Sequence, residues 1–202
     1  MTGLISPADV AAIAPAGYYI ALRIGFAFPL EEQNALPADW VEHYTTQRFM
    51  LHDPVIRWMY TNTGAIRWSE IDLDDPMRVM QQAHAFGLRF GCAIACFDGN
   101  AEGQRSFGSF VRRDREFEGP EIAVLRAYVS RLHYDKAPPT NLTKAEIVAL
   151  RMVKEGQRLK EIAHEIGVSE GAIKQRLRNA KLKLGAKTSA QAAAAASEFG
   201  LI

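Results

Sequence analysis

Two adjacent prolines, Pro138 and Pro139, mark the clearest boundary along the chain. They lie in the polar stretch DKAPPTNLT, residues 135–143. Proline lacks the amide hydrogen that a helix needs and restricts the residue before it to extended conformations, so no helix continues through this stretch. We therefore expect one domain at 1–134, a short semi-rigid linker at 135–141 and a second domain at 142–202.

The two parts carry net charges of opposite sign. From residue 140 onward there are 11 Lys and Arg residues against 6 Asp and Glu, a net charge of +5. The preceding residues contain 13 against 17, a net charge of −4. A basic C-terminal part on an acidic body predicts that the C-terminal part contacts a polyanion.

Downstream of the linker the sequence predicts four short helices. Thr143 and Glu146 have the spacing of a reciprocal capping box, in which each side chain accepts a hydrogen bond from the other residue's amide. Ser169 and Thr188 occupy equivalent capping positions before the third and fourth helices, and Gly167 ends the second. The short GVS turn between the second and third helices is typical of a helix-turn-helix.

The third of these helices has an apolar face beside a cationic one. Its buried seam is predicted to be Ile173, Leu177, Ala180 and Leu184. The cationic face follows one position later, and acidic partners are missing between 174 and 183, which argues against an ordinary solvated face. We expect phosphate contacts from Lys174, Arg178, Lys181 and Lys183, and base recognition by Lys174, Gln175 and Arg178.

Residues 142–202 resemble the DNA-binding domain of LuxR-type transcriptional regulators. The matching positions are Glu146, Leu150, Gly156, Ile162, Ala163, Leu177 and the closing KLG of residues 183–185. The resemblance implies an all-α, four-helix module that dimerises through its last helix and places its third helix in the major groove of double-stranded DNA.

The first part has the pattern of an α+β domain. Residues 17–30 form an aromatic and aliphatic run that predicts a strand, and the runs 91–97 and 105–111 predict a hairpin. Helices are predicted from Pro37, from Asp75 with Pro76 as the first helical residue, and over 119–135. Together these elements predict an antiparallel sheet flanked by helices.

Residues 40–70 resemble the autoinducer-binding domain of the quorum-sensing branch of the same family. The match consists of Trp40, Tyr44, the pair Asp53-Pro54 and the WSE that starts at Trp68. The run 86–97 also resembles the central strand of that domain and the glycine-rich turn before it. The resemblance implies that an N-acyl-homoserine lactone receives a hydrogen bond from Trp40 and donates one to Asp53, with Tyr44 and Trp68 as walls. The alternatives are core packing for the three aromatic residues and a helix cap for Asp53.

The sequence also departs from that family. Leu36 stands where members usually have a tyrosine that bonds the ligand's amide carbonyl, and Val55 where some members have a hydroxyl. Ser106 or Ser109 is a candidate replacement for the lost hydroxyl. These changes make one side of the expected pocket more apolar.

Other function classes find little support in the sequence. Cys92 and Cys96 lack nearby ligands for a metal site, no catalytic motif occurs, and no apolar run resembles a membrane span or signal peptide. We expect a cytoplasmic, homodimeric, non-enzymatic transcriptional regulator that needs no cofactor and senses an N-acyl-homoserine lactone or a similar amphipathic molecule. The alternative, favoured by Leu36 and Gly171, is a ligand-independent member that acts by heterodimerisation with a related regulator.

Overall fold

The computed structural model describes residues 5–25, 28–99, 104–139 and 141–202, and the chain forms two compact units, Met1–Lys136 and Ala137–Ile202. We call them the sensor unit and the helical unit and describe each by itself. The last helix of the sensor unit, α5 (Gly119–Asp135), extends one residue into the stretch expected as linker.

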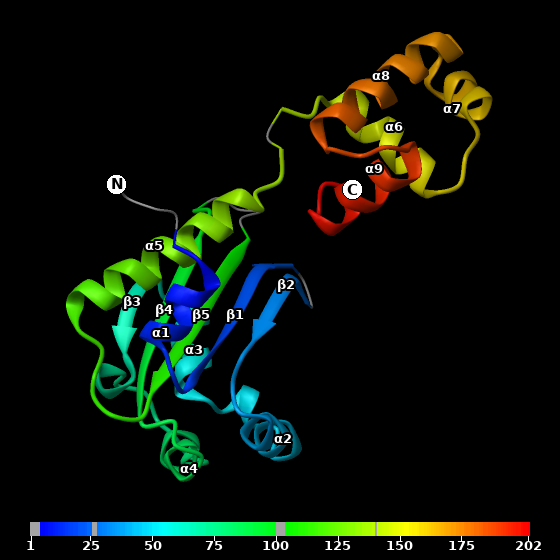
Figure 1. The fold of residues 1–202 in the computed structure, drawn as a ribbon. Coiled ribbons are helices and arrows are strands. Elements are labelled where there is room, and N and C mark those ends of the chain that lie inside the picture. The colour runs from blue at the N-terminus through cyan, green and yellow to red at the C-terminus, as the bar shows by residue number, and fades with distance from the viewer. Residues whose placement is uncertain (1–4, 26–27, 100–103, 140) are drawn as a thin grey trace. The chain divides into compact units, whose positions relative to one another are not determined.

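The sensor unit is built on one antiparallel sheet of five strands. They are β1 (Gly17–Ile24), β2 (Pro29–Asn34), β3 (Gly64–Arg67), β4 (Phe90–Phe97) and β5 (Arg105–Arg112). Their order is β2-β1-β5-β4-β3 (Figure 1). The predicted hairpin is β4 and β5, whose connecting residues 100–103 lie outside the described residues. The expected α+β class is confirmed.

The expected single strand over 17–30 is wrong. The structure has two antiparallel strands there, and Pro29 of β2 pairs with Ile24 of β1. The register of β1 against β5 shifts between Ala21 and Ile24, where Arg23 adopts a left-handed φ of 52°. The aromatic and aliphatic run continues from β1 into the start of β2, so the sequence pattern gives no sign of this change of direction.

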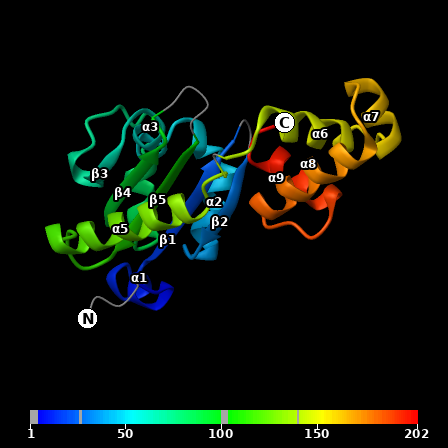
Figure 2. The ribbon, with the colours of Figure 1, turned by 90° about the horizontal axis from the view of Figure 1, so that it is seen from above.

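Helices cover both faces of the sheet, as Figures 1 and 2 show. One face packs against α5 and the short α1 (Pro7–Ile13), through β1 residues Ile20 and Leu22. The other face, with Tyr19 and Ala21, packs under α2 (Ala38–Thr46), α3 (Pro54–Thr61) and α4 (Val79–Ala85). A 3-10 turn, η1 (Phe49–Leu51), lies between α2 and α3, and a second, η2 (Trp68–Glu70), follows β3 on the way to α4. The alternation of side chains along β1 thus separates two apolar cores.

Helix α4 begins at Val79, three residues later than predicted. Asp75 does cap the helix, since its carboxylate accepts from the amides of Val79 at 2.7 Å and Met80 at 3.0 Å. However, Arg78 has a left-handed φ of 53°, so residues 76–78 form a turn and not the first helical turn. The cap was therefore predicted correctly and the first helical residue was not.

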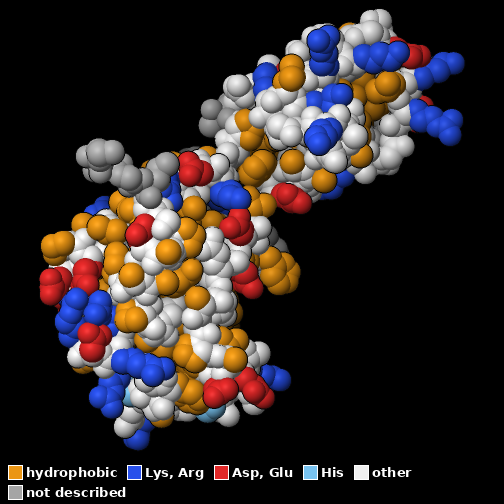
Figure 3. Space-filling view, in the orientation of Figure 1, with side chains coloured by type: hydrophobic (Ala, Val, Ile, Leu, Met, Phe, Trp, Pro, Cys, Tyr) orange, Lys and Arg blue, Asp and Glu red, His pale blue; other side chains and the backbone are white. Residues whose placement is uncertain are grey.

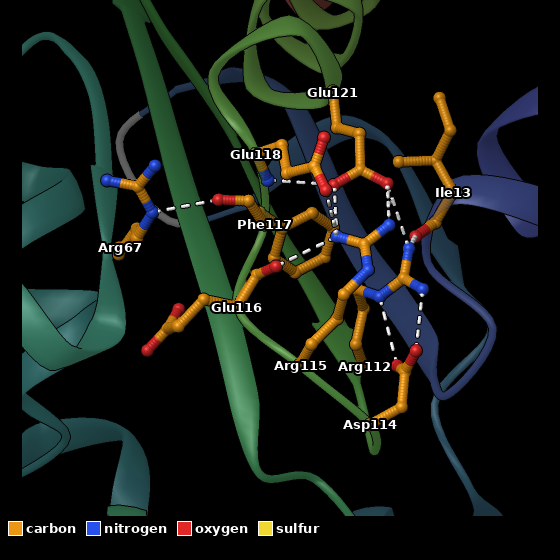
Figure 4. A network of polar contacts seen from close by, with 9 residues as sticks. All are labelled: Ile13, Arg67, Arg112, Asp114, Arg115, Glu116, Phe117, Glu118 and Glu121. Atoms are coloured by element: carbon orange, nitrogen blue, oxygen red, sulfur yellow. Dashed lines mark hydrogen bonds and ion pairs between the residues drawn. The ribbon is translucent and has the colours of Figure 1, made fainter.

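A network of arginines and carboxylates fixes the start of α5 to the sheet and to α1 (Figure 4). Arg112 on β5 donates to Asp114 and Glu121 and to the backbone oxygen of Ile13. Arg115 donates to both oxygens of Glu121 at 2.8 Å. The hydrogen bonds from Arg115, with the charge of Arg112, lower the pKa of Glu121 to about 2, so this junction stays charged in moderate acid.

The helical unit consists of α6 (Lys144–Lys154), α7 (Leu159–Ile166), α8 (Glu170–Lys183) and α9 (Ser189–Glu198). The predicted capping box is present: Thr143 accepts from the Glu146 amide at 3.2 Å, and Glu146 accepts from the Thr143 amide at 2.8 Å. Gly167 ends α7 with a φ of 74°, and Ser169 caps α8. The predicted seam of α8 lies in the core, with three residues buried and Leu184 partly buried.

Candidate functional site

A cavity of about 350 Å³ lies between the sheet of the sensor unit and helices α2, α3 and α4. All six residues proposed as ligand contacts line it, namely Leu36, Trp40, Tyr44, Asp53, Val55 and Trp68. They come from α2, the residues flanking it, α3 and η2. The structure thus brings the whole predicted set around a single space.

Asp53 is held at the cavity by two kinds of hydrogen bond. Its Oδ1 accepts from the amides of Val55 at 2.7 Å and Ile56 at 3.4 Å, so the helix-cap alternative for Asp53-Pro54 holds as well. Its Oδ2 accepts from the Tyr44 hydroxyl at 2.8 Å. Burial raises the pKa of Asp53 despite these bonds. The carboxylate is therefore an oriented acceptor with few competing donors, suited to a ligand N–H.

Two indole N–H groups belong to residues that line the same cavity as this carboxylate. Nε1 of Trp68 is buried and has no hydrogen-bond partner among the described residues, and Trp40 donates to none of them either. The Trp68 ring rests on the backbone of Gly91, where a Cβ atom would approach within 2.0 Å of its Cδ2. Because buried donors are normally paired, the cavity suits a ligand with carbonyl oxygens.

The strands supply a further part of the lining. Of the two serines considered as replacements for the lost hydroxyl, Ser109 on β5 reaches the cavity, whereas Ser106 lies on the other face of the sheet. Tyr19 on β1 and Glu32 and Asn34 on β2 also line the cavity, and the sequence analysis missed these three. The alternation of side chains along residues 17–24 would have placed Tyr19 and Ala21 on one face of the sheet. Glu32 could not be placed in this way, because the turn before β2 was not predicted.

A buried cluster on the α5 side has the side chains of a hydrolase triad but lacks its accessibility. Ser106 Oγ lies 2.7 Å from His133 Nδ1, and His133 Nε2 lies 3.0 Å from Asp98 Oδ1. Ser106 and His133 are both 0% exposed, and Ser106 accepts from the Arg23 amide at 2.8 Å. A nucleophile needs an open approach for its substrate. We therefore assign this cluster to stabilising the bulged end of β1 against α5.

In the helical unit, α8 presents most of its predicted DNA-contacting residues outward. Lys174, Gln175 and Arg178 are exposed and Lys181 is half-buried. Lys and Arg side chains gather over α7 and α8 in Figure 3. In the described part of the chain none of the three cations, Lys174, Arg178 and Lys181, enters an ion pair with an acidic side chain, whereas Gln175 donates to Asn179 at 2.9 Å.

Lys183 is placed differently from the expectation. Its ammonium donates to Glu146 Oε1 at 3.0 Å and Oε2 at 2.8 Å, and to the Asn141 carbonyl at 2.7 Å. Glu146 is only 3% exposed. A buried carboxylate requires a nearby cation, so Lys183 has a structural partner that competes with any phosphate.

Within the described residues, no cluster of three or more potential metal ligands occurs. Over the same ranges, none of the helices combines the length and the apolar character needed to cross a bilayer.

Comparison with protein families accounts for both units. Residues 33–133 match the autoinducer binding domain, and residues 140–196 match the bacterial regulatory proteins of the luxR family. The chain belongs to the LuxR family. It is a quorum-sensing type of transcriptional regulator, with an autoinducer-binding domain followed by a helix-turn-helix, and both resemblances noted in the sequence are confirmed.

Individual relatives agree with this LuxR-family assignment. The quorum sensing-dependent transcriptional regulator RpaR of Rhodopseudomonas palustris is 30% identical over 179 residues, which span 84% of this chain and 74% of RpaR. The transcriptional activator VanR of Vibrio anguillarum is 29% identical over 169 residues, 77% of this chain and 70% of VanR.

Solved structures show the same fold. Escherichia coli SdiA matches with a TM-score of 0.54 and 24% identity, covering 98% of this chain and 93% of SdiA. SdiA in complex with octanoyl-rac-glycerol matches with a TM-score of 0.53 and 23% identity, covering 96% and 87%. At these identities the likeness concerns the fold of this LuxR-family regulator and not its ligand.

Proposed function

We propose that the sensor unit of this LuxR-family regulator binds an N-acyl-homoserine lactone in the cavity beneath α2, α3 and α4. The observation that carries this proposal is the set of polar groups at the cavity. They are the oriented carboxylate of Asp53 and the indole N–H groups of Trp40 and Trp68, which have no hydrogen-bond partner among the described residues. The ligand offers an amide N–H and carbonyl oxygens in the same molecule, and its acyl chain suits the apolar remainder of the lining.

Each contact has a distinct proposed role. Trp40 donates to the lactone carbonyl, and Asp53 accepts from the ligand amide. Tyr44 orients Asp53 by its 2.8 Å hydrogen bond, and Trp68 forms a wall. Leu36 and Val55 offer apolar contact in place of the hydroxyls that the family resemblance leads one to expect.

Removing one indole N–H tests the ligand site. Trp40→Phe keeps an aromatic ring but loses the donor, so we expect lactone affinity to fall about tenfold, the loss of roughly 1.4 kcal/mol. Isothermal titration of the full chain with N-octanoyl-homoserine lactone measures it. Trp58→Phe is the matched control, because Trp58 packs beside the same core without lining the cavity. Equal affinity of the Trp40 variant and the wild type would contradict the assigned donor.

We propose further that α8 binds double-stranded DNA through Lys174, Gln175, Arg178 and Lys181. These residues lie on the outward face of the helix that follows the turn at Gly167. In a symmetric homodimer the two copies of α8 would reach half-sites ~34 Å apart. Such a regulator would act in the cytoplasm, where its DNA lies.

The salt dependence of operator binding tests the interface. Arg178→Ala should weaken binding and reduce the slope of log affinity against log salt by about 1, because one phosphate contact is lost. Arg89→Ala removes one exposed charge from the sensor unit and should leave the slope unchanged. A gel shift with and without lactone also separates this function from the ligand-independent, heterodimerising alternative, which predicts no response to lactone.

A further inference from the structure

One wall of the sensor cavity is more polar than an aliphatic acyl chain requires. It is formed by the paired strands β1 and β2, where Ile24 and Pro29 give an apolar end and Tyr19, Ala21, Glu32 and Asn34 form the rest. In the strand register Tyr19 lies opposite Asn34, and Ala21 lies opposite Glu32. This wall is separate from Trp40 and Asp53, which belong to α2 and the start of α3.

Tyr19 and Glu32 are joined across the strands. The Tyr19 hydroxyl donates to Glu32 Oε2 at 3.1 Å, which leaves Glu32 Oε1 without a hydrogen-bond partner among the described residues. Burial, followed by the charge of Glu32, raises the pKa of Tyr19 to about 12, so the hydroxyl remains a donor at any physiological pH. The pair therefore orients a carboxylate whose second oxygen can accept a hydrogen bond.

An apolar chain against this carboxylate would displace water without replacing its hydrogen bonds. A ligand hydroxyl would replace one of them, and a hydrogen bond to a charged group is among the stronger polar contacts in proteins. Glu32 is on an edge strand and remains accessible to water. We therefore expect a preference of moderate size and not an absolute requirement.

We propose that Tyr19 and Glu32 are specificity determinants that select N-acyl-homoserine lactones with a hydroxyl group on the acyl chain, the hydroxyl donating to Glu32 Oε1. This inference rests on the proposed lactone-binding function and names the class of acyl chain. The neighbouring Glu31 points away from the cavity and pairs with Lys136, which makes it an internal comparison on the same strand.

Three lactones of equal chain length test the preference. They are N-octanoyl-, N-(3-hydroxyoctanoyl)- and N-(8-hydroxyoctanoyl)-homoserine lactone, titrated calorimetrically into the purified full chain. At least one hydroxylated ligand should bind about tenfold more tightly than the unsubstituted one, since a hydrogen bond to a charged group contributes on that order. The two hydroxyl positions sample chain atoms near the amide and at the chain end.

Variants then assign the preference to the wall. Glu32→Met and Tyr19→Phe should bring the affinity ratio of hydroxylated to unsubstituted ligand close to one, while binding of the unsubstituted lactone persists. Glu31→Met is the matched control and should keep the wild-type ratio. Circular dichroism melting identifies any variant that fails to fold. If one of the two cavity variants does not fold, the affinity ratio of hydroxylated to unsubstituted lactone in the other variant tests the assignment.

The outcomes separate the two proposals. Equal wild-type affinity for all three lactones overturns the hydroxyl preference and leaves the lactone-binding function intact. A preference that survives in Glu32→Met overturns the assignment to this pair. Failure of the folded wild type to bind any of the three overturns the proposed ligand class and the inference together.

Discussion

Replacing Lys183 by methionine should destabilise the helical unit more than it weakens DNA binding. Lys183 supplies the only ammonium within bonding distance of Glu146 among the described residues, through bonds of 3.0 and 2.8 Å. Glu146 is 3% exposed and would retain one hydrogen bond to its carboxylate, from the Thr143 amide at 2.8 Å. Breaking a buried ion pair from one side costs ~3–5 kcal/mol.

The Lys183 side chain is 24% exposed, so water can replace part of the ammonium. We therefore expect a loss of about 2–3 kcal/mol, which lowers the melting temperature of a unit this small by roughly 10–20 °C. Calorimetric melting of the full chain measures it. Lys181→Met, two residues earlier on α8, is the control: it should change stability by less than about 0.5 kcal/mol and lower the salt slope of DNA binding by about 1.

The pH dependence of this loss distinguishes an unpaired carboxylate from a packing defect. Burial by itself would raise the pKa of Glu146, but Lys183 and the Thr143 amide outweigh it and lower the pKa in the native chain. The native pair therefore contributes stability above the unfolded-state pKa, and that stability is lost as pH falls through the lower folded-state pKa. Without Lys183 the burial effect dominates, so the difference between variant and wild type should shrink as pH falls from 7 towards about 4. An unchanged melting temperature together with a reduced salt slope would refute the structural role.

Two further predictions concern the sensor unit. Gly91→Ala should displace the Trp68 ring, because the new Cβ would lie 2.0 Å from it. We expect the free energy of unfolding in urea to fall by about 1–3 kcal/mol and lactone binding to be abolished. Gly119→Ala is the control, because no atom lies within 4 Å of the added carbon. Burial and then the charge of Arg23 lower the pKa of His133, so its contribution to stability should be lost as pH falls below about 6.5. Urea titrations between pH 7 and 5 measure how the free energy of unfolding changes with pH. A His133→Phe variant whose unfolding free energy falls with pH as steeply as that of the wild type would contradict this role of His133.

Sequence alone predicted the helical unit well because its signals are local. Thr143 and Glu146 are three residues apart, and Gly167 and Ser169 mark the turn before α8 directly. Long-range pairing was beyond this reasoning. Lys183 lies 37 residues from Glu146, and spacing along α8 gave it the same cationic character as Lys181.

In the sensor unit, local signals predicted several helices and strands but not the bulge and the turn at which the chain changes direction. The positive φ of Arg23 falls on a residue type that rarely adopts it. That conformation lets the Arg23 amide reach Ser106, which is 83 residues away in the chain. The alternation of side chains along a strand does not indicate such a bulge. Because residues 17–30 were predicted as one strand, the start of β2 was missed, and Glu32 was missed with it. The six proposed ligand contacts that line the cavity came from family resemblance, which supplied positions that hydrophobic periodicity does not provide.

The departures at the cavity have a common consequence for the ligand. By resemblance to the family, Leu36 removes a hydroxyl from the end of the cavity that would hold the amide carbonyl. The strand register instead places Tyr19 and Glu32 on the β1–β2 wall. For the proposed lactone, polar recognition would thereby be reduced at the amide end and increased along the acyl chain. A polar wall strongly rejects a chain that lacks a partner for its polar groups, whereas an apolar wall rejects an added hydroxyl only weakly. Ligand discrimination by the proposed site should therefore depend on the substituents of the acyl chain more than on the amide region.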